Sequence, residues 1–284
     1  MVIKKIVLGF FLFSSITTSI ALSEISEEFR GKLTNLKWVA FAPTNFNPEK
    51  EIYPSEDSLR KDLQLLFQYG FNGVVTYGAN ATLAKIPQLA KETGFSGVIM
   101  GIWDIESKDE MENALLARNY VDGYCLGNEG LNSRYNADSL KKAIATMKDL
   151  TGLPVTTTEQ IFDYYNDNVL VIGDWIFPNI HPFLCSIRGA KKCVTWIERN
   201  YAILKKHNKD GRPILFKEVG FPTSGDNQAS EINQRDFFLE SEKANIPFVY
   251  FEAFDQPWKN NLPVEPHWGL FKQNRKPKKF MLIK

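Results

Sequence analysis

Two carboxylic acids that come just after apolar segments are the residues of this chain best suited to chemistry. Glu129 follows Asn128 in the run 122–131, which reads DGYCLGNEGL. Glu218 follows a second apolar run at 213–216. Two such acids can cooperate if one donates a proton while the other, ionised, acts as a nucleophile or base. Whether the two acids meet depends on the elements that carry them.

Eight apolar segments of strand-like composition divide the chain. They cover residues 36–43, 71–77, 97–103, the run from 122, 154–157, 175–180, 213–216 and 247–251. Segments of helical periodicity lie between them, such as the stripe formed by Leu59, Leu63 and Leu66. Alternation of strands with helices is typical of βαβ units and of a parallel sheet.

Local signals mark where some of these helices begin. Ser55 is a candidate N-cap for the helix that carries the leucine stripe. Ser107 and Glu110 have the spacing of a capping box, in which each side chain bonds the backbone of the other residue. A further helix-like segment is predicted at 159–165, before the sixth strand.

The pattern predicts an α/β fold, a single-domain (β/α)8 TIM barrel. A doubly wound open sheet is the alternative, but it normally carries a glycine-rich phosphate loop after its first strand, and residues 42–45 read APTN. No linker rich in proline, glycine or serine divides the chain. The last barrel helix is expected to be short or absent, because residues 272–279 show no apolar periodicity.

In such a barrel the carboxyl ends of all strands converge on one face, where barrel enzymes keep their active sites. The fourth strand would deliver Asn128 and Glu129 to that face, and the seventh would deliver Glu218. Two acids from distant strands suit glycoside hydrolysis, in which one protonates the leaving oxygen and the other attacks the anomeric carbon. A retaining mechanism needs the two carboxyl groups about 5 to 5.5 Å apart.

Aromatic residues at or just past the strand ends are candidates for stacking on sugar rings. They are Tyr77, Trp103, Phe183, Phe221, Trp258 and Trp268. Packing in the core or in loops is an equally good interpretation of any one of them. His181 could orient a neighbour or simply be satisfied by local backbone. Glu252 and Asp255 could equally be members of structural ion pairs.

Five short stretches together resemble glycoside hydrolase family 17. They are GNE at 127–129, NIHPF at 179–183, EVGFPTSG at 218–225, FEAFDQPWK at 251–259 and HWGLF at 267–271. The resemblance runs from Trp38 to Phe271, and it implies a β-1,3-glucanase or glucanosyltransferase that acts with retention. Carried over by position, it makes Glu129 the acid/base and Glu218 the nucleophile, with Lys259 and Glu252 as supporting polar residues.

The chain also departs from the pattern of that family. Val75 stands where the family often has arginine, Phe221 where it often has tryptophan, and Gln256 where it often has a second carboxylate. These differences affect the substrate subsites more than the reaction. Lys217 precedes the expected nucleophile and, in a regular strand, would point away from it, so it is assigned no role.

The N-terminus predicts export. Lys4 and Lys5 precede an apolar run at 6–13, and small residues at Ser19 and Ala21 favour cleavage after residue 21. We therefore expect a signal peptide at 1–21 and a catalytic domain at 22–284. The apolar run is too short to span a bilayer, although retention as an uncleaved anchor is the alternative. The expected location is secreted, periplasmic or cell envelope, with no stable membrane insertion after cleavage.

Charge, cysteine and histidine usage narrow the function further. The formal charge of +1 becomes −1 when Lys4 and Lys5 leave with the signal peptide, which argues against a nucleic-acid partner. Of the three cysteines, Cys125 lies in a predicted strand, so only Cys185 and Cys193 are candidates to pair, and that pairing stays open. The three histidines show no metal-ligand spacing, and no metal or cofactor is expected.

The sequence thus predicts a monomeric, retaining, endo-type β-1,3-glucan hydrolase whose partner is a β-glucan polysaccharide or oligosaccharide. Expected ligands of the sugar are Asn128, Tyr77, His181, Glu252, Lys259, Phe221, Trp258 and Trp103. Three alternatives stay open: a glucanosyltransferase with the same site, a barrel that binds glucan without cleaving it, and a related glycosidase acting on another polysaccharide.

Overall fold

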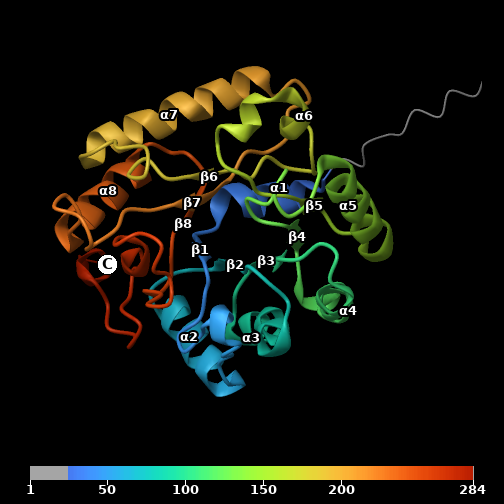
Figure 1. The fold of residues 1–284 in the computed structure, drawn as a ribbon, viewed down its shortest axis with the longest axis horizontal. Helices are drawn as coiled ribbons and strands as arrows, with labels where there is room; N and C mark the ends of the chain where they lie inside the picture. The colour runs from blue at the N-terminus through green and yellow to red at the C-terminus, as the bar shows by residue number, and fades with distance from the viewer. Residues whose placement is uncertain (1–24, 284) are drawn as a thin grey trace, which may run out of the picture.

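The computed structural model describes residues 25–283, so the expected signal peptide at 1–21 lies outside the described residues. Its centre is a sheet of eight parallel strands, in the spatial order β5-β4-β3-β2-β1-β8-β7-β6 (Figure 1). The strands are β1 (Trp38–Ala40), β2 (Gly73–Val75), β3 (Gly97–Ile102), β4 (Gly123–Leu126), β5 (Val155–Thr156), β6 (Asn179–Ile180), β7 (Phe216–Val219) and β8 (Phe248–Tyr250). A parallel bridge between Gln160 and Asn179 joins the two ends of this order.

Helices surround the sheet and alternate with its strands, which confirms the predicted (β/α)8 barrel. The α-helices are α1 (Glu27–Asn35), α2 (Glu56–Gln68), α3 (Ile86–Thr93), α4 (Lys108–Leu116), α5 (Ala137–Thr151), α6 (Asp167–Leu170), α7 (Ala190–His207) and α8 (Glu231–Lys243). The 3-10 turns are η1 (Pro48–Lys50), η2 (Ala81–Lys85), η3 (Arg118–Tyr120), η4 (Asp163–Tyr165), η5 (Glu265–His267) and η6 (Lys279–Ile283). As expected, no α-helix follows β8 within the described residues, where only the short turns η5 and η6 are found.

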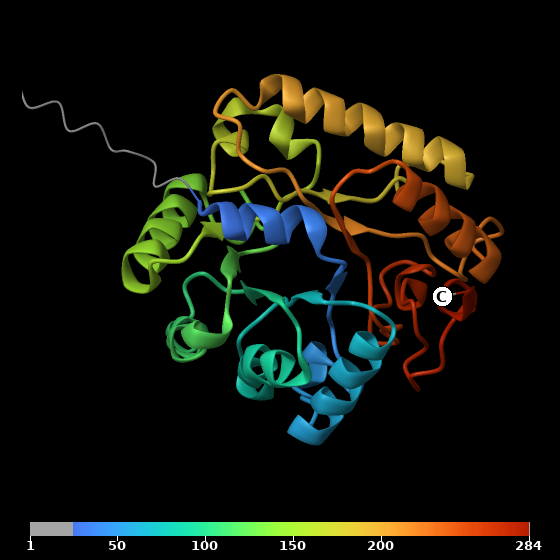
Figure 2. The same ribbon diagram turned by 180° about the vertical axis from the view of Figure 1, so that it is seen from behind.

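Helix α1 covers the end of the barrel where the strands begin (Figure 2). Its Phe29 packs edge-on against Trp175, with ring centroids 5.2 Å apart. Its Lys32 forms an ion pair with Asp122, the residue before β4, at 2.8 Å between Nζ and Oδ1. Because this end is closed, the opposite end, where the strands finish, is the face available to a ligand.

Trp38, at the start of β1, fills the lower part of the barrel and is fully buried. Its ring lies against Gly73 and Gly97. Gly73 begins β2, which pairs with β1, and Gly97 begins β3, which pairs with β2. A Cβ atom at either glycine would lie 2.5 Å from a ring carbon of Trp38. Glycine is therefore required at both positions because the indole occupies the space that a side chain would need.

Ser55 caps α2 as predicted, since its hydroxyl accepts a hydrogen bond from the Ser58 backbone at 3.2 Å. The capping box at the start of α4 is only half formed. Ser107 accepts from the Glu110 backbone at 3.2 Å. The Glu110 carboxylate instead accepts from the backbone of Ala79 and of Trp103, both at 2.9 Å. This buried acid thereby fixes the loops that leave β2 and β3.

Three predicted segments differ in the structure. The sixth strand, expected at 175–180, is reduced to Asn179–Ile180, because Pro178 has no amide hydrogen to continue the ladder. The seventh, expected at 213–216, instead covers Phe216–Val219, so Glu218 lies within the strand. The segment 159–165 is not a continuous helix: Gln160 bridges to β6, and only the turn η4 and the four-residue α6 follow.

The three cysteines are free, so Cys185 and Cys193 do not pair in this structure. Cys125 is buried in β4 as predicted, Cys193 is buried in α7, and Cys185 is exposed. Within residues 25–283, none of the helices combines the length and the apolar character that crossing a membrane requires.

Candidate active site

A cavity of about 570 Å³ opens at the carboxyl ends of the strands. Eight of the ten predicted site residues line it: Tyr77, Trp103, Asn128, Glu129, His181, Glu218, Trp258 and Lys259. They come from six different strands or the loops that follow them, so the barrel collects them from across the sequence. The two that do not line the cavity are Phe221 and Glu252.

Glu129 and Glu218, the two acids predicted to cooperate, lie close together in this cavity. A carboxylate oxygen of Glu129, one of Glu218 and a ring nitrogen of His181 all lie within 4.8 Å of one another. This is close to the spacing of about 5 to 5.5 Å that retaining glycosidases use and shorter than the about 6.5 to 9.5 Å of inverting ones. The arrangement therefore suits a reaction in which both acids contact one reacting centre.

Glu129 is held by hydrogen bonds from two amide side chains. Asn179 donates to its Oε1 at 2.7 Å, and Gln160 donates to its Oε2 at 3.3 Å. The backbone of Glu129 is left-handed, with φ of 50°, which is uncommon for a residue other than glycine. Its amide donates to Thr158 at 2.9 Å. Backbone strain of this kind costs energy and is found at functional sites where the surroundings impose it.

A buried carboxylate, Glu159, holds the residues that follow Glu129. Glu159 accepts from the Tyr135 hydroxyl at 2.8 Å and from the Leu131 backbone at 3.3 Å. The Tyr135 hydroxyl also accepts from the Gly130 backbone at 3.1 Å. The segment just after Glu129 is thus tied to the end of β5. Burial raises the pKa of Glu159, and these hydrogen bonds oppose that shift.

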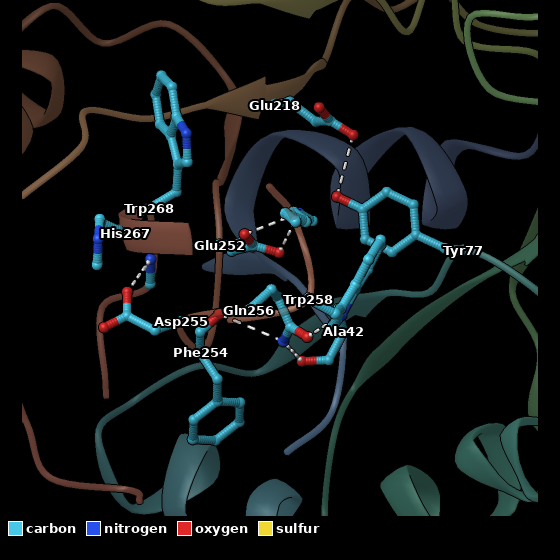
Figure 3. A network of polar contacts seen from close by, with 12 residues as sticks. Ala42, Tyr77, Glu218, Glu252, Phe254, Asp255, Gln256, Trp258, His267 and Trp268 are labelled. Atoms are coloured by element: carbon cyan, nitrogen blue, oxygen red, sulfur yellow. Dashed lines mark hydrogen bonds and ion pairs between the residues drawn. The ribbon is translucent and has the colours of Figure 1, made fainter. Parts of the chain in front are cut away.

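Glu218 is 5% exposed and is surrounded by donors. Its Oε1 accepts from the Tyr77 hydroxyl at 3.0 Å (Figure 3). The same oxygen accepts from Lys217 Nζ at 3.0 Å, and Oε2 lies 3.2 Å from His181 Nε2. Burial alone would raise the pKa of Glu218. The positive charge of Lys217, with the contact from His181, outweighs burial and holds the pKa well below its usual range. Glu218 is therefore held in its ionised form.

Lys217 contradicts the sequence prediction that it points away from Glu218. Phe216 pairs with Phe248, and Val219 pairs with Tyr250. Between these two pairs, β7 contains one residue more than β8. Such a bulge interrupts the alternation of side chains between the two faces. Lys217 and Glu218 therefore both lie inside the barrel, 1% and 5% exposed.

Asn128 is oriented by two donors to its amide oxygen. Lys217 Nζ donates to Asn128 Oδ1, and Asn179 Nδ2 donates to the same atom at 3.5 Å. With Oδ1 occupied in this way, the Nδ2 group of Asn128 is the part of the side chain available to a ligand in the cavity.

Lys259, which lines the cavity, forms an ion pair with the buried Glu252. Figure 3 shows the Glu252 carboxylate. Lys259 Nζ donates to the two carboxylate oxygens of Glu252 at 2.8 and 2.9 Å. Glu252 is fully buried and does not line the cavity, so a direct contact between it and a ligand is not supported. Burial raises the pKa of Glu252 to about 7, although Lys259 opposes that shift and Glu218 adds to it.

Trp103 and Trp258 place indole rings at the cavity. Trp103 is 44% exposed, and the guanidinium of Arg134 lies over its ring at 4.3 Å. Arg134 also donates to the backbone oxygens of Trp103 and Asn128, so it joins the loops after β3 and β4. Trp258 Nε1 donates to Gln256 at 2.8 Å, and Gln256 in turn donates to the Ala42 backbone at 2.9 Å.

Phe221 does not face the cavity, which corrects its prediction as a sugar ligand. It is 1% exposed and packs between Phe183 and Phe237, at ring-centroid distances of 4.9 and 5.6 Å. Phe183 is likewise buried in this cluster. Trp268 is buried yet lines the cavity, where it packs on His181 at 5.5 Å.

The family model of the BtgE/BtgC glycoside hydrolase domain matches residues 39–269. This match includes every residue of the cavity discussed above. The chain belongs to the BtgE/BtgC glycoside hydrolase family. The first and last strands of the barrel both fall within the matched region, apart from Trp38 at the start of β1.

The curated relatives include proteins named after this family. The chain is 25% identical over 278 residues to a probable glucan endo-1,3-beta-glucosidase btgC of Aspergillus flavus, covering 79% of this chain and 40% of that one. It is 27% identical over 254 residues to a glucan 1,3-beta-glucosidase of Arthroderma benhamiae, covering 77% and 82%. The chain thus spans only about 40% of the length of the Aspergillus relatives that it matches.

The fold also resembles solved glycosidases. An endo-laminarinase from Formosa Hel1_33_131 superposes with a TM-score of 0.74 at 17% identity, covering 90% of this chain and 88% of that one. The β-1,3-glucanase and allergen CJP38 of Cryptomeria japonica pollen gives a TM-score of 0.65 at 14% identity, covering 85% and 97%. At these identities the likeness concerns the fold.

Five polar residues that contact or support the site were missed by sequence reasoning: Lys217, Asn179, Gln160, Glu159 and Arg134. Gln160 and Glu159 belong to the polar run at 157–160, which reads TTEQ and follows β5. A polar run at a strand's carboxyl end is the same signal that identified Glu129. It was overlooked because 159–165 was assigned to a helix. Lys217 gave no sequence signal, since its position depends on the bulge.

The raised pKa of Glu252 predicts a change in stability with pH. Between about pH 4.5 and 7 the folded protein holds a proton on Glu252 that the unfolded chain, with a pKa near 4.5, has lost. The free energy of unfolding should therefore fall across this window as pH rises. A shift of this size corresponds to at most about 3 kcal/mol.

The E252Q variant removes this titration. We expect the difference in unfolding free energy between wild type and E252Q to change between pH 5 and pH 8, with wild type losing more stability as pH rises. Urea unfolding of both proteins at several pH values measures it. The exposed E198Q on α7 is the control, and a difference between wild type and E252Q that is constant with pH would contradict the prediction.

Proposed function

We propose that this chain hydrolyses β-1,3-glucan with retention of anomeric configuration, with Glu218 as the nucleophile and Glu129 as the acid/base. The observation that carries this proposal is the close pair of carboxylates, of which Glu218 alone is held ionised by a buried cation. The glucanase names of the curated relatives support the substrate. The motifs GNE at 127–129, EVGFPTSG at 218–225 and FEAFDQPWK at 251–259 support the finer assignment to glycoside hydrolase family 17.

The reaction proceeds in two displacements. The carboxylate of Glu218 attacks the anomeric carbon, the bond from that carbon to the glycosidic oxygen breaks, and Glu129 gives its proton to that oxygen. Glu129 then removes a proton from water, and the water oxygen displaces Glu218 from the sugar. The second step returns both acids to their starting states, so no cofactor is required.

The cavity residues divide between holding the sugar and holding the acids. Asn128 donates from Nδ2 to a sugar hydroxyl beside the reacting carbon, and Lys259 offers a further donor. The ring faces of Trp103 and Trp258 suit the apolar faces of sugar rings. Tyr77 and His181 contact the two oxygens of Glu218 and fix its orientation. Glu252 acts indirectly, by placing Lys259.

The N-terminal pattern of residues 1–21 supports export of the chain to the cell envelope or beyond, where polysaccharide substrates lie. A monomer is proposed there. Transfer of the glycosyl group to a second sugar is the main alternative outcome at the same site. A barrel that only binds glucan is disfavoured, because such a protein has no use for an ionised acid facing a second acid.

Removing either acid should abolish most hydrolysis of laminarin. E129Q should lower turnover by about 10² to 10⁴-fold, because general acid catalysis contributes that much. E218Q should lower turnover at least as far, since no covalent intermediate can form. Reducing-end release measures both, and E198Q, on the outer face of α7, should retain wild-type activity. Near-wild-type hydrolysis by both E129Q and E218Q would refute the assignment.

The separation of the acids also predicts the stereochemical outcome. The first sugar released from a β-1,3-linked oligosaccharide should be the β-anomer, because two inversions give net retention. Proton NMR during the first minutes of the reaction, before mutarotation, measures the anomer. An initial α-anomer would mean direct attack by water. Oligosaccharides longer than the substrate in the same samples would reveal glycosyl transfer.

A panel of linkage-defined oligosaccharides separates the proposed substrate from its alternatives. We expect cleavage of β-1,3-glucan oligosaccharides to exceed that of β-1,4-glucan and β-1,4-mannan oligosaccharides, by kcat/KM. Preference for a β-1,4 substrate would contradict the proposed β-1,3-glucan substrate but not the proposed hydrolysis by the two acids. Laminarin binding without cleavage of any member of the panel would favour the binding protein.

A further inference from the structure

Lys217 presents an ammonium group inside the barrel, next to the proposed nucleophile. Its side chain is 1% exposed. Nζ donates to Glu218 Oε1 at 3.0 Å, donates to Asn128 Oδ1, and lies 4.3 Å from the centre of the Tyr77 ring. The three contacts come from β7, from the loop after β4 and from the segment after β2, so the ammonium joins three sides of the cavity.

A buried ammonium is costly unless an opposite charge and good hydrogen bonds compensate it. Glu218 is the carboxylate in direct contact with Lys217. Glu252, the other fully buried acid nearby, is already paired with Lys259. Glu129 is bonded by the neutral amides of Asn179 and Gln160. Glu218 is therefore the acid that can balance the charge of Lys217. It does so in its ionised form.

His181 also faces Glu218 but supplies a different kind of contact. The His181 ring carries a positive charge only when both of its nitrogens are protonated. The attraction between Lys217 and Glu218 does not require protonation of His181. Tyr77 supplies a neutral hydroxyl. Of the groups that contact the Glu218 carboxylate in the described chain, Lys217 is the one with a standing positive charge.

We propose that Lys217 is a positioning residue that keeps Glu218 ionised and turns the Nδ2 group of Asn128 toward the sugar. The proposal rests on the proposed function, in which Glu218 must be ionised to attack. The bulge in β7 is what makes it possible, because a regular strand would place Lys217 on the outer face. The same charge favours the second displacement, since loss of the sugar restores the carboxylate that balances the ammonium.

The direct test observes ionisation of Glu218 without any turnover. Protein labelled with ¹³C at the glutamate side-chain carboxyl groups is titrated by NMR, and the E218Q variant identifies the signal of Glu218. In K217M the midpoint for Glu218 should rise by about one to three pH units, the range for loss of a nearby opposite charge. K217R, which keeps the charge, should stay near wild type. An unchanged midpoint in K217M would overturn the proposal.

The pH profile of kcat/KM tests the same point in catalysis. The acid limb reports the pKa of the base or nucleophile in the free enzyme, so in K217M it should move to higher pH by a similar amount. K278M is the matched control, because Lys278 is another buried lysine bonded to a carboxylate, Asp255, at 2.6 Å but lies outside the cavity. K278M should leave the acid limb in place. A uniform loss of activity at all pH values in K217M would indicate a structural role and refute the proposal.

A stability cycle keeps the proposal testable if K217M is too unstable for kinetics. K217M should be less destabilising in the E218Q background than in wild type, because no ionised acid is then left without its partner. Additive effects would overturn the proposal. Failure of the proposed function is distinguishable: wild type would not cleave glucan, whereas the NMR midpoint and the cycle would still report the coupling.

Discussion

The site depends on one irregularity, the extra residue in β7. A parallel barrel strand sends alternate side chains inward, which would allow either Lys217 or Glu218 to face the cavity. The bulge brings both inside and places a cation beside an acid that burial alone would neutralise. Asn128 and Tyr77 are then positioned against the same ammonium. The electrostatics of the cavity follow from this local change in backbone geometry.

Much of the site could be predicted because barrel geometry turns sequence position into spatial position. Glu129 and Glu218 each follow apolar runs, and the strand count alone brings their ends together. Lys217 could not be predicted, because the position of a bulge depends on pairing with β8 and not on local composition. Phe221 failed for a different reason: apolar character at a strand end does not distinguish a ligand platform from core, and neighbouring rings enclose it.

Buried carboxylates behind the cavity fix the loops that carry its residues. The capping signals in the sequence did not predict this role. Glu110 bonds the loops after β2 and β3, and Glu159 bonds the loop that carries Glu129. Glu252 in turn holds Lys259. Each places an acceptor where several backbone or side-chain donors converge, so the loops are fixed from within the barrel. Loops held in this way can present strained residues such as Glu129 in a single geometry.

The two acids of the cavity have contrasting surroundings. Glu218 is almost fully buried, accepts hydrogen bonds from Lys217 and the Tyr77 hydroxyl, and lies beside His181. The charge of Lys217, with the nearby His181, outweighs burial and lowers the pKa of Glu218. Glu129 is more open to the cavity and is bonded by the neutral amides of Asn179 and Gln160. Neutral donors compensate a buried carboxylate less than an ammonium does. The proposed roles, in which Glu218 is the nucleophile and Glu129 the proton donor, are consistent with this difference in surroundings.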